Sequence, residues 1–224
     1  MTVAIVNYNT TELTDAAIRS VRKHTPGCQV IVFDNSDKTP FVPSVPDVEV
    51  LDNTKGQIID FDEMLSHYPN RETGERNRSN FGSAKHCMSV DKLMNMLPDG
   101  FVLMDSDVLV TRDISKLVSN AVVCGTVGIK EGVQLFLPYL CWLNVPLLQH
   151  HHIRYFNGDK MWALSDIYPN NRYDTGAWLY EEVNTKKLVY KSVDIMDYIV
   201  HFGHGSWYGR DASEWLNAYK FLYE

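Results

Sequence analysis

The chain has 224 residues, of which 45% are hydrophobic and 12% aromatic. This is enough material for the buried core of one moderately large domain, and it excludes a compositionally disordered chain. The 28 acidic residues outnumber the 21 Lys and Arg residues and give a net charge of -7, which argues against a nucleic-acid-binding protein with a basic surface.

The four cysteines lack Cys-x-x-Cys spacing, which predicts reduced and mostly buried thiols: Cys28, Cys87, Cys124 and Cys141. The N-terminal residues lack the basic and long apolar segments of a signal peptide. The longest apolar stretch, residues 133–148, contains Pro138 and Pro146 and is too short to span a bilayer. We therefore expect a cytoplasmic protein. Residues 135–148, which include Tyr139 and Trp142, could form an acceptor platform or rest on the inner face of a membrane, although ordinary core is the better interpretation.

The first third of the chain alternates strand and helix patterns. Residues 2–7 form a short apolar run rich in β-branched side chains, as in a buried parallel strand. Apolar side chains then recur every four positions from Leu13 to Val21, which predicts an amphipathic helix. Residues 29–33 and 48–51 predict two further strands, so the chain opens like a Rossmann-type sheet.

The middle of the chain contains the strongest strand pattern. Residues 54–82 are polar and turn-rich, and we interpret them as a loop with at most a short helix. Ser83 is suited to cap a helix that ends before Pro98. Residues 101–104 form a strongly apolar strand, and a further strand is expected over residues 121–129.

The second half has less regular patterns. An aromatic segment covers residues 135–155, and a helix is expected over residues 176–187. Strand-like runs follow at residues 187–190 and 198–202. A variant of the capping box that begins at Asp211 predicts a C-terminal helix.

Together these elements predict a three-layer α/β/α sandwich around a mostly parallel, Rossmann-like sheet. Internal repeats, low-complexity tracts and linkers are not evident in the sequence. We therefore expect a single domain over residues 1–224.

Two carboxylates, Asp105 and Asp107, follow the apolar strand at residues 101–104. Open α/β sheets place their ligands at the carboxyl ends of such strands. Carboxylate oxygens are natural ligands for a Mg²⁺ or Mn²⁺ ion that bridges a diphosphate, so the pair predicts a metal site at which Asp105 also contacts the nucleotide. An acidic turn is the alternative. Asp60 and Asp62 repeat the spacing without a preceding apolar strand, and we assign them no function.

Polar residues also follow two other predicted strands. The run Asn-Tyr-Asn at residues 7–9 ends the first strand, and Asp-Asn-Ser at residues 34–36 ends the second. With the acidic pair near position 100, these strand ends resemble the GT-A glycosyltransferases, in particular the large family-two group. The resemblance covers residues 2–37 and the strand that leads to Asp107.

The resemblance implies a GT-A-type fold and the metal-dependent transfer of a sugar from a nucleoside-diphosphate sugar to an acceptor hydroxyl. The acceptor would be a glycan or a lipid-linked molecule, and the pathway cell-surface polysaccharide or glycan synthesis. Residues 1–110 would form the nucleotide-binding half of the domain and residues 111–224 the acceptor-binding half.

The same resemblance implies which residues hold the nucleoside. In that family the first-strand loop and the second-strand Asp have this role, which would fall to Asn7, Tyr8, Asn9 and Asp34. An acidic side chain at a strand end suits ribose hydroxyls or a base N–H. Ordinary turns at both strand ends are the alternative.

A histidine from the C-terminal part of the chain is the third metal ligand that the resemblance implies. His201, at the end of a strand-like run, matches best, and His204 is second. A histidine ligand favours Mn²⁺ over Mg²⁺. His86, in the first turn of the helix before the acidic pair, could face the diphosphate or lie on the surface. The three histidines at residues 150–152 cannot all face one site, so we interpret them as a solvated turn.

An inverting transfer needs a carboxylate that takes the proton of the acceptor hydroxyl. Family-two enzymes carry this base in a Glu-Asp pair before a helix, whereas this chain has Asp-Thr-Gly at residues 174–176. We predict that Asp174 is the catalytic base of an inverting reaction. A helix cap is the alternative role for this residue.

Two other functions compete with a glycosyltransferase. A sugar nucleotidyltransferase would share the sheet and the acidic metal site. It would resemble its relatives in a Gly-rich, Arg-containing first loop, where this chain has Asn-Thr-Thr-Glu at residues 9–12. A non-catalytic nucleotide-sugar-binding protein would keep the fold without the base.

Overall fold

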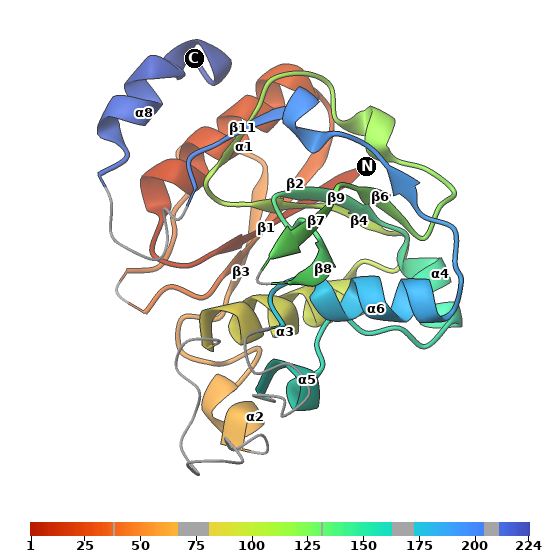
Figure 1. Ribbon diagram of the computed structural model, residues 1–224. Coiled ribbons are helices and arrows are strands. Elements are labelled where there is room, and N and C mark those ends of the chain that lie inside the picture. The colour runs from red at the N-terminus through yellow and green to blue at the C-terminus, as the bar shows by residue number, and fades with distance from the viewer. Residues whose placement is uncertain (38, 67–80, 131, 163–172, 204–210) are drawn as a thin grey trace.

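The computed structural model describes the chain except for residues 38, 67–80, 131, 163–172 and 204–210. Figure 1 shows a central sheet with helices on both of its faces. The helices are α1 (Thr11–His24), α2 (Phe61–Ser66), α3 (Phe81–Met96), α4 (Val145–His150), α5 (Gly158–Trp162), α6 (Ala177–Thr185) and α8 (Ser213–Ala218). Short 3-10 turns occur at Ser115–Leu117, Ile195–Asp197 and Lys220–Leu222.

The central sheet has seven strands in the order β10-β6-β9-β4-β1-β2-β3. In chain order they are β1 (Thr2–Asn7), β2 (Gln29–Asp34), β3 (Val48–Asp52), β4 (Phe101–Asp105), β6 (Val123–Gly125), β9 (Leu140–Leu143) and β10 (Lys191–Ser192). β1 is parallel to β2 and β4, and β2 is parallel to β3, whereas β9 is antiparallel to β4 and β6. The predicted mostly parallel sheet is confirmed, with β9 as the reversed strand.

Alternation along β1 shows how the sheet separates two cores. Val3 and Ile5 pack in one hydrophobic cluster with side chains of α1, while Ala4 and Val6 pack in another with side chains of α3 and α6. Successive side chains of a strand point to opposite faces, so a strand that is apolar throughout needs cover on both sides. The predicted three-layer sandwich is therefore confirmed.

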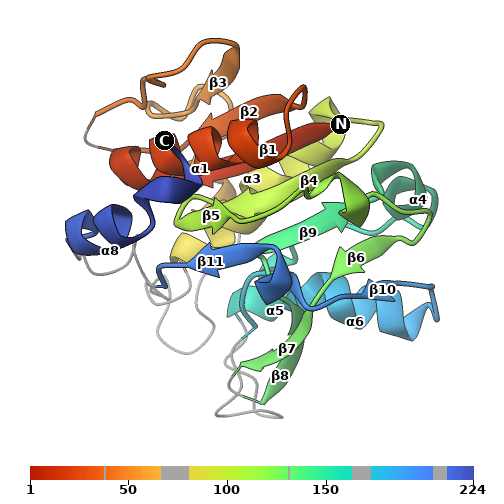
Figure 2. The ribbon, with the colours of Figure 1, turned by 90° about the horizontal axis from the view of Figure 1, so that it is seen from above.

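Two short sheets lie beside the main one. β5 (Val108–Val110) pairs antiparallel with β11 (Ile199–His201), and β7 (Val127–Lys130) pairs antiparallel with β8 (Val133–Phe136). Figure 2 shows β11 alongside β5, and the β7–β8 hairpin reaching away from the central sheet. Both pairs carry residues into the site described below.

The structure corrects two strand predictions. The strand expected over residues 121–129 is two strands, because the chain changes hydrogen-bonding partners after β6, which pairs with β9, and continues as β7 in the hairpin. The strand expected at residues 187–190 is irregular, and β10 follows it. The core interpretation is confirmed for residues 140–148, since Leu140, Leu143 and Leu148 have no exposed surface. Residues before them, among them Leu137 and Tyr139, line the cavity described below.

Asp60, in the second Asp-x-Asp sequence, has a structural role. Its carboxylate accepts hydrogen bonds from the backbone N–H groups of Asp62 and Glu63 at 2.9 Å each, as a cap of α2 does. In the described ranges, no helix is both long enough and apolar enough to cross a membrane.

Gly176 fixes the start of α6 close to β8. Its φ is +86°, and a Cβ at this position would lie 2.1 Å from the backbone oxygen of Phe136. Gly27 has a similar φ of +80° with nothing within 4 Å of such a Cβ. The two glycines therefore share the backbone conformation and differ in the close approach.

We predict that Gly27→Ala lowers the free energy of unfolding by roughly 1–2 kcal/mol, the cost of a left-handed backbone at a residue with a Cβ. Gly176→Ala should cost clearly more, because the same backbone cost is joined by a clash with Phe136. Urea titrations of the two variants measure both values. Equal losses would show that the close approach at Gly176 relaxes easily.

Candidate functional site

Three parallel strands bring their carboxyl ends to one edge of the sheet. β1 lies between β2 and β4, and its register places Asn7 beside Asp34 and Val6 beside Asp105. The carboxyl edge of an open α/β sheet is the usual ligand position. The polar strand ends that the sequence singled out are therefore neighbours in the structure.

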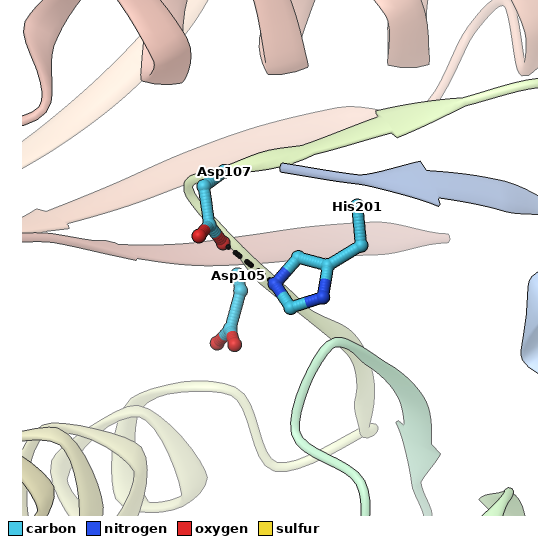
Figure 3. Close-up of side chains that lie close together, drawn as sticks. All are labelled: Asp105, Asp107 and His201. Atoms are coloured by element: carbon cyan, nitrogen blue, oxygen red, sulfur yellow. Dashed lines mark ion pairs between the residues drawn. The ribbon is translucent and has the colours of Figure 1, made fainter. Parts of the chain in front are cut away.

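The β5–β11 pairing adds a histidine to the acidic pair. His201 stands opposite Val108, and the N–H of Phe202 donates to the backbone oxygen of Asp107 at 3.0 Å. As a result, His201 Nε2 lies 3.2 Å from Asp107 Oδ1. One possible ligand atom from each of Asp105, Asp107 and His201 lies within 4.8 Å of the others. Figure 3 shows the imidazole directed at the two carboxylates.

The electrostatics of this cluster favour a bound cation. Burial and the charge of Asp107 raise the pKa of Asp105 to about 7. Burial lowers the pKa of His201, but its hydrogen bond to Asp107 and the charges of both carboxylates raise that pKa above its usual value. Two partly buried carboxylates with an imidazole form a suitable ligand set for a divalent transition metal such as Mn²⁺.

The cluster opens into a cavity of about 620 Å³, a size that suits a small-molecule ligand. Its walls come from the end of β1, the first turns of α3, the β7–β8 hairpin with the segment after it, and the turn before α6. Of the residues predicted for the site, the cavity is lined by Tyr8, His86, Asp105, Asp107, Asp174 and His201. Both predicted halves of the domain therefore contribute to it.

Asn7 and Asp34 have no exposed surface and do not line this cavity. Asn7 Nδ2 donates to Asp34 Oδ1 at 2.8 Å, and the N–H of Phe41 donates to Asp34 Oδ2 at 2.7 Å. Asn7 Oδ1 also accepts from the hydroxyl groups of Thr10 and Thr14. These bonds hold the two strand-end loops, and their predicted contact with a nucleoside stays a prediction.

The first loop itself presents Tyr8. The Tyr8 side chain is on the cavity wall and is 37% exposed, while its hydroxyl donates to Asp37 at 2.8 Å. Asn9 has a φ of 57°, and its Nδ2 donates to the other carboxylate oxygen of Asp37. Asn9 thus stabilises the loop, and the Tyr8 side chain lines the cavity.

His86 lies on the α3 wall. Its Nε2 is 4.0 Å from Asp105 Oδ1 and is buried without a hydrogen-bond partner in the described part of the chain. Burial lowers the pKa of His86 to about 4, so the imidazole is neutral at physiological pH. The alternative of a surface position is excluded by this burial.

Asp174, in the turn before α6, also lines the cavity and contacts α3. Its Oδ1 accepts from the Ser83 hydroxyl at 2.6 Å and from the N–H of Thr175 at 2.7 Å, and its other oxygen pairs with Lys130. Burial raises the pKa of Asp174, but the hydrogen bonds from Lys130 and Ser83 bring it below its ordinary value. The carboxylate is therefore ionised and joins α3, the hairpin and the start of α6.

His204 lies outside the described residues, so its position cannot be compared with that of His201. The histidines at residues 150–152 end α4 and do not line the cavity. Sequence reasoning missed three residues that line the cavity, Ser83, Lys85 and Lys130. Tyr139, which also lines it, was considered only as part of a possible acceptor platform. Periodicity could not identify them, because each reaches the site through contacts between distant segments.

The sequence matches neither a known protein family nor a curated protein. Its structure is similar to that of an active-site mutant of the galactosyltransferase LgtC, with a TM-score of 0.53, 12% identity, and coverage of 87% of this chain and 73% of that one. It is also similar to mouse xyloside xylosyltransferase 1, with a TM-score of 0.50, 10% identity, and coverage of 87% and 86%. At these identities the likeness is one of fold.

We predict that Asp105→Asn stabilises the metal-free protein at pH 8. In the folded protein the pKa of Asp105 is raised to about 7, whereas the pKa of an unfolded Asp is roughly 3.9. Between these two pH values the folded state keeps a proton on Asp105 that the unfolded state has lost. The free energy of unfolding should fall as pH rises through this window, and the substitution should remove that fall. The melting temperature at pH 8 should rise by at least about 2–4 °C, which corresponds to roughly 1 kcal/mol.

Melting curves with a chelator at pH 4 and pH 8 measure this effect. Asp113→Asn is a control of opposite sign, because hydrogen bonds from Ser115 lower the pKa of that exposed carboxylate. Adding Mn²⁺ should reverse the order of wild type and Asp105→Asn. If Asp105→Asn has the same melting temperature as wild type at both pH values, the prediction is wrong.

Proposed function

Because the chain has the α/β fold of the GT-A glycosyltransferases, we propose that it transfers a sugar from a nucleoside-diphosphate sugar to an acceptor hydroxyl. The observation that carries this proposal is the Asp105–Asp107–His201 cluster at the bottom of a cavity on the carboxyl edge of the sheet. The fold is the one that the sequence resemblance implied, while the closer likeness to family two stays a prediction.

Asp105, Asp107 and His201 would hold a Mn²⁺ or Mg²⁺ ion, and the imidazole favours Mn²⁺. Such an ion supplies positive charge that neutralises the departing nucleoside diphosphate. Without it, three cavity carboxylates, those of Asp105, Asp107 and Asp174, would repel a diphosphate. His86, neutral and beside Asp105, would contact the nucleotide as a hydrogen-bonding group rather than as a charge.

The nucleoside would lie against Tyr8, whose ring forms part of the cavity wall near Asn35. Flat bases bind well on aromatic faces. Lys85 Nζ lies 5.5 Å from the centre of this ring, which places a positive charge at the same wall. Asn7, Asn9 and Asp34 would act on the nucleoside through the loop that they hold.

Asp174 remains our candidate for the base that accepts the proton of the acceptor hydroxyl, as an inverting reaction requires. Its ionised state suits a proton acceptor, although the pairing with Lys130 weakens its basicity. The acceptor would enter from the side of residues 111–224, which supply the hairpin and the turn before α6. A glycan or a lipid-linked saccharide, used in surface polysaccharide synthesis on the cytoplasmic side, fits this proposal.

A non-catalytic nucleotide-sugar-binding protein is the second candidate, because Asp174 stands outside the Glu-Asp pattern of family two. A sugar nucleotidyltransferase is less favoured, since the first loop lacks glycines and arginine. A thermal-shift screen of nucleotide sugars with Mn²⁺ identifies the donor, since a selective ligand stabilises the folded state. Hydrolysis or transfer of that donor then separates an enzyme from a binding protein.

We predict that nucleoside-diphosphate binding requires a divalent ion held by Asp107. Asp107→Ala should lower the affinity for UDP or GDP in the presence of Mn²⁺ by at least about 10-fold and leave the unfolding transition cooperative. Isothermal calorimetry with Mn²⁺, and with EDTA in its place, measures this. Asp62→Ala, in the exposed copy of the same spacing, should bind like wild type. Equal wild-type affinity with EDTA and with Mn²⁺ would rule out the proposed metal site.

We predict that Asp174→Asn lowers the transfer rate by at least about 100-fold, the lower end for loss of a general base, without changing nucleotide affinity. Lys130→Met should raise the pKa of Asp174, since the lysine lowers it. The acidic limb of the pH–rate profile should therefore move to higher pH in Lys130→Met. An unmoved limb, or an active Asp174→Asn variant, would argue that Asp174 only binds substrate or caps α6.

A further inference from the structure

Tyr139 contacts two of the three cluster residues, Asp105 and His201, although sequence analysis gave it no role at the metal site. It directly precedes β9, whose antiparallel register with β4 pairs Leu140 with Met104. The next pair in this register is Tyr139 with Asp105. The N–H of Asp105 donates to the backbone oxygen of Tyr139 at 3.2 Å, which continues the ladder by one residue.

The side chain of Tyr139 contacts His201. Its ring centroid lies 3.9 Å from that of His201, with 35° between the planes, so the rings are stacked with a tilt. The Tyr139 side chain packs against the hydrophobic cluster that contains Val108 of β5 and Ile199 of β11, in agreement with its contact with His201.

The stack matters because, among the described residues, it is the ring contact of the imidazole. In the ranges that the structure describes, the polar partner of the ring is Asp107, through Nε2. Nε2 also faces both carboxylates and would be the atom that takes a metal ion. A bound ion would replace the contact with Asp107 and leave the Tyr139 ring as the protein contact that orients the imidazole.

We propose that Tyr139 is a positioning residue for the metal ligand His201, acting through the face of its ring rather than through its hydroxyl. This inference rests on the proposed metal site. Residues that orient a metal ligand from outside the coordination sphere typically change metal affinity by about 10- to 100-fold when they are replaced. The hydrogen bond from the Asp105 N–H to the Tyr139 backbone oxygen fixes the position of Tyr139 relative to Asp105. Tyr139 therefore helps to set the distance between the His201 imidazole and the Asp105 carboxylate.

The test measures Mn²⁺ and Mg²⁺ affinity of the full chain by calorimetry, without nucleotide. Tyr139→Leu should weaken Mn²⁺ binding by about 10- to 100-fold and Mg²⁺ binding by less, because imidazole contributes more to Mn²⁺. Tyr139→Phe keeps the ring and should bind both ions like wild type. Tyr198→Leu is a matched control, since Tyr198 precedes β11 and its ring contacts Arg112 instead of the cluster.

A double-mutant cycle shows whether Tyr139 acts through His201. In a His201→Ala background, Tyr139→Leu should change Mn²⁺ affinity by less than about twofold, because the ring has no imidazole left to orient. Melting curves establish that each variant is folded. If Tyr139→Leu is unfolded, Tyr139→Met, with a longer and more adaptable side chain, carries the same comparison.

The outcomes separate the two proposals. Wild type that fails to bind Mn²⁺ overturns the metal site itself. Wild type that binds Mn²⁺ while folded Tyr139→Leu binds it equally well overturns only the role of Tyr139. The role of Tyr139 is also overturned if Tyr139→Phe loses as much Mn²⁺ affinity as Tyr139→Leu. It is overturned as well if Tyr139→Leu weakens Mn²⁺ binding equally in the His201→Ala background.

Discussion

Two carboxylates held next to each other at the end of a buried strand are the constraint on which the rest of the site depends. Burial and mutual repulsion both disfavour two negative charges at Asp105 and Asp107. His201 offsets this repulsion in part, because its imidazole hydrogen-bonds to Asp107. The same repulsion lowers the stability of the fold and would favour binding of a cation.

The strands that run against the parallel sheet build this receptive site. β9 places Tyr139 opposite Asp105, and β11 places His201 beside Asp107. β9 begins at the carboxyl edge of the sheet and β11 ends beside it, so residues from the second half of the sequence meet a strand end from the first. The parallel strands thus provide the acidic edge, and the antiparallel ones provide the groups that surround it.

The cavity above the cluster has a different origin on each side. On one side, a fully buried network around Asn7 and Asp34 fixes the loops that carry Tyr8 and Asn35. Buried polar groups that are all satisfied make such loops rigid, which suits recognition of a planar group. On the other side, the pairing of Asp174 with Lys130 links the hairpin to the turn before α6, and Lys130 remains half-exposed. We expect this second wall to respond more readily to a ligand.

The sequence by itself determined the layers, most of the sheet and the positions of its acidic strand ends, because these follow from local periodicity and from rules that hold for any parallel sheet. It also indicated Asp105 and Asp107 from the apolar strand that precedes them, and His201 through the resemblance to GT-A glycosyltransferases. Only the tertiary structure decided that these three meet, that Asp34 is buried and does not line the cavity, and that Lys130 and Tyr139 belong to the site. Such contacts join segments that are far apart in the chain, and strand register and packing set them, neither of which leaves a periodic trace in the sequence.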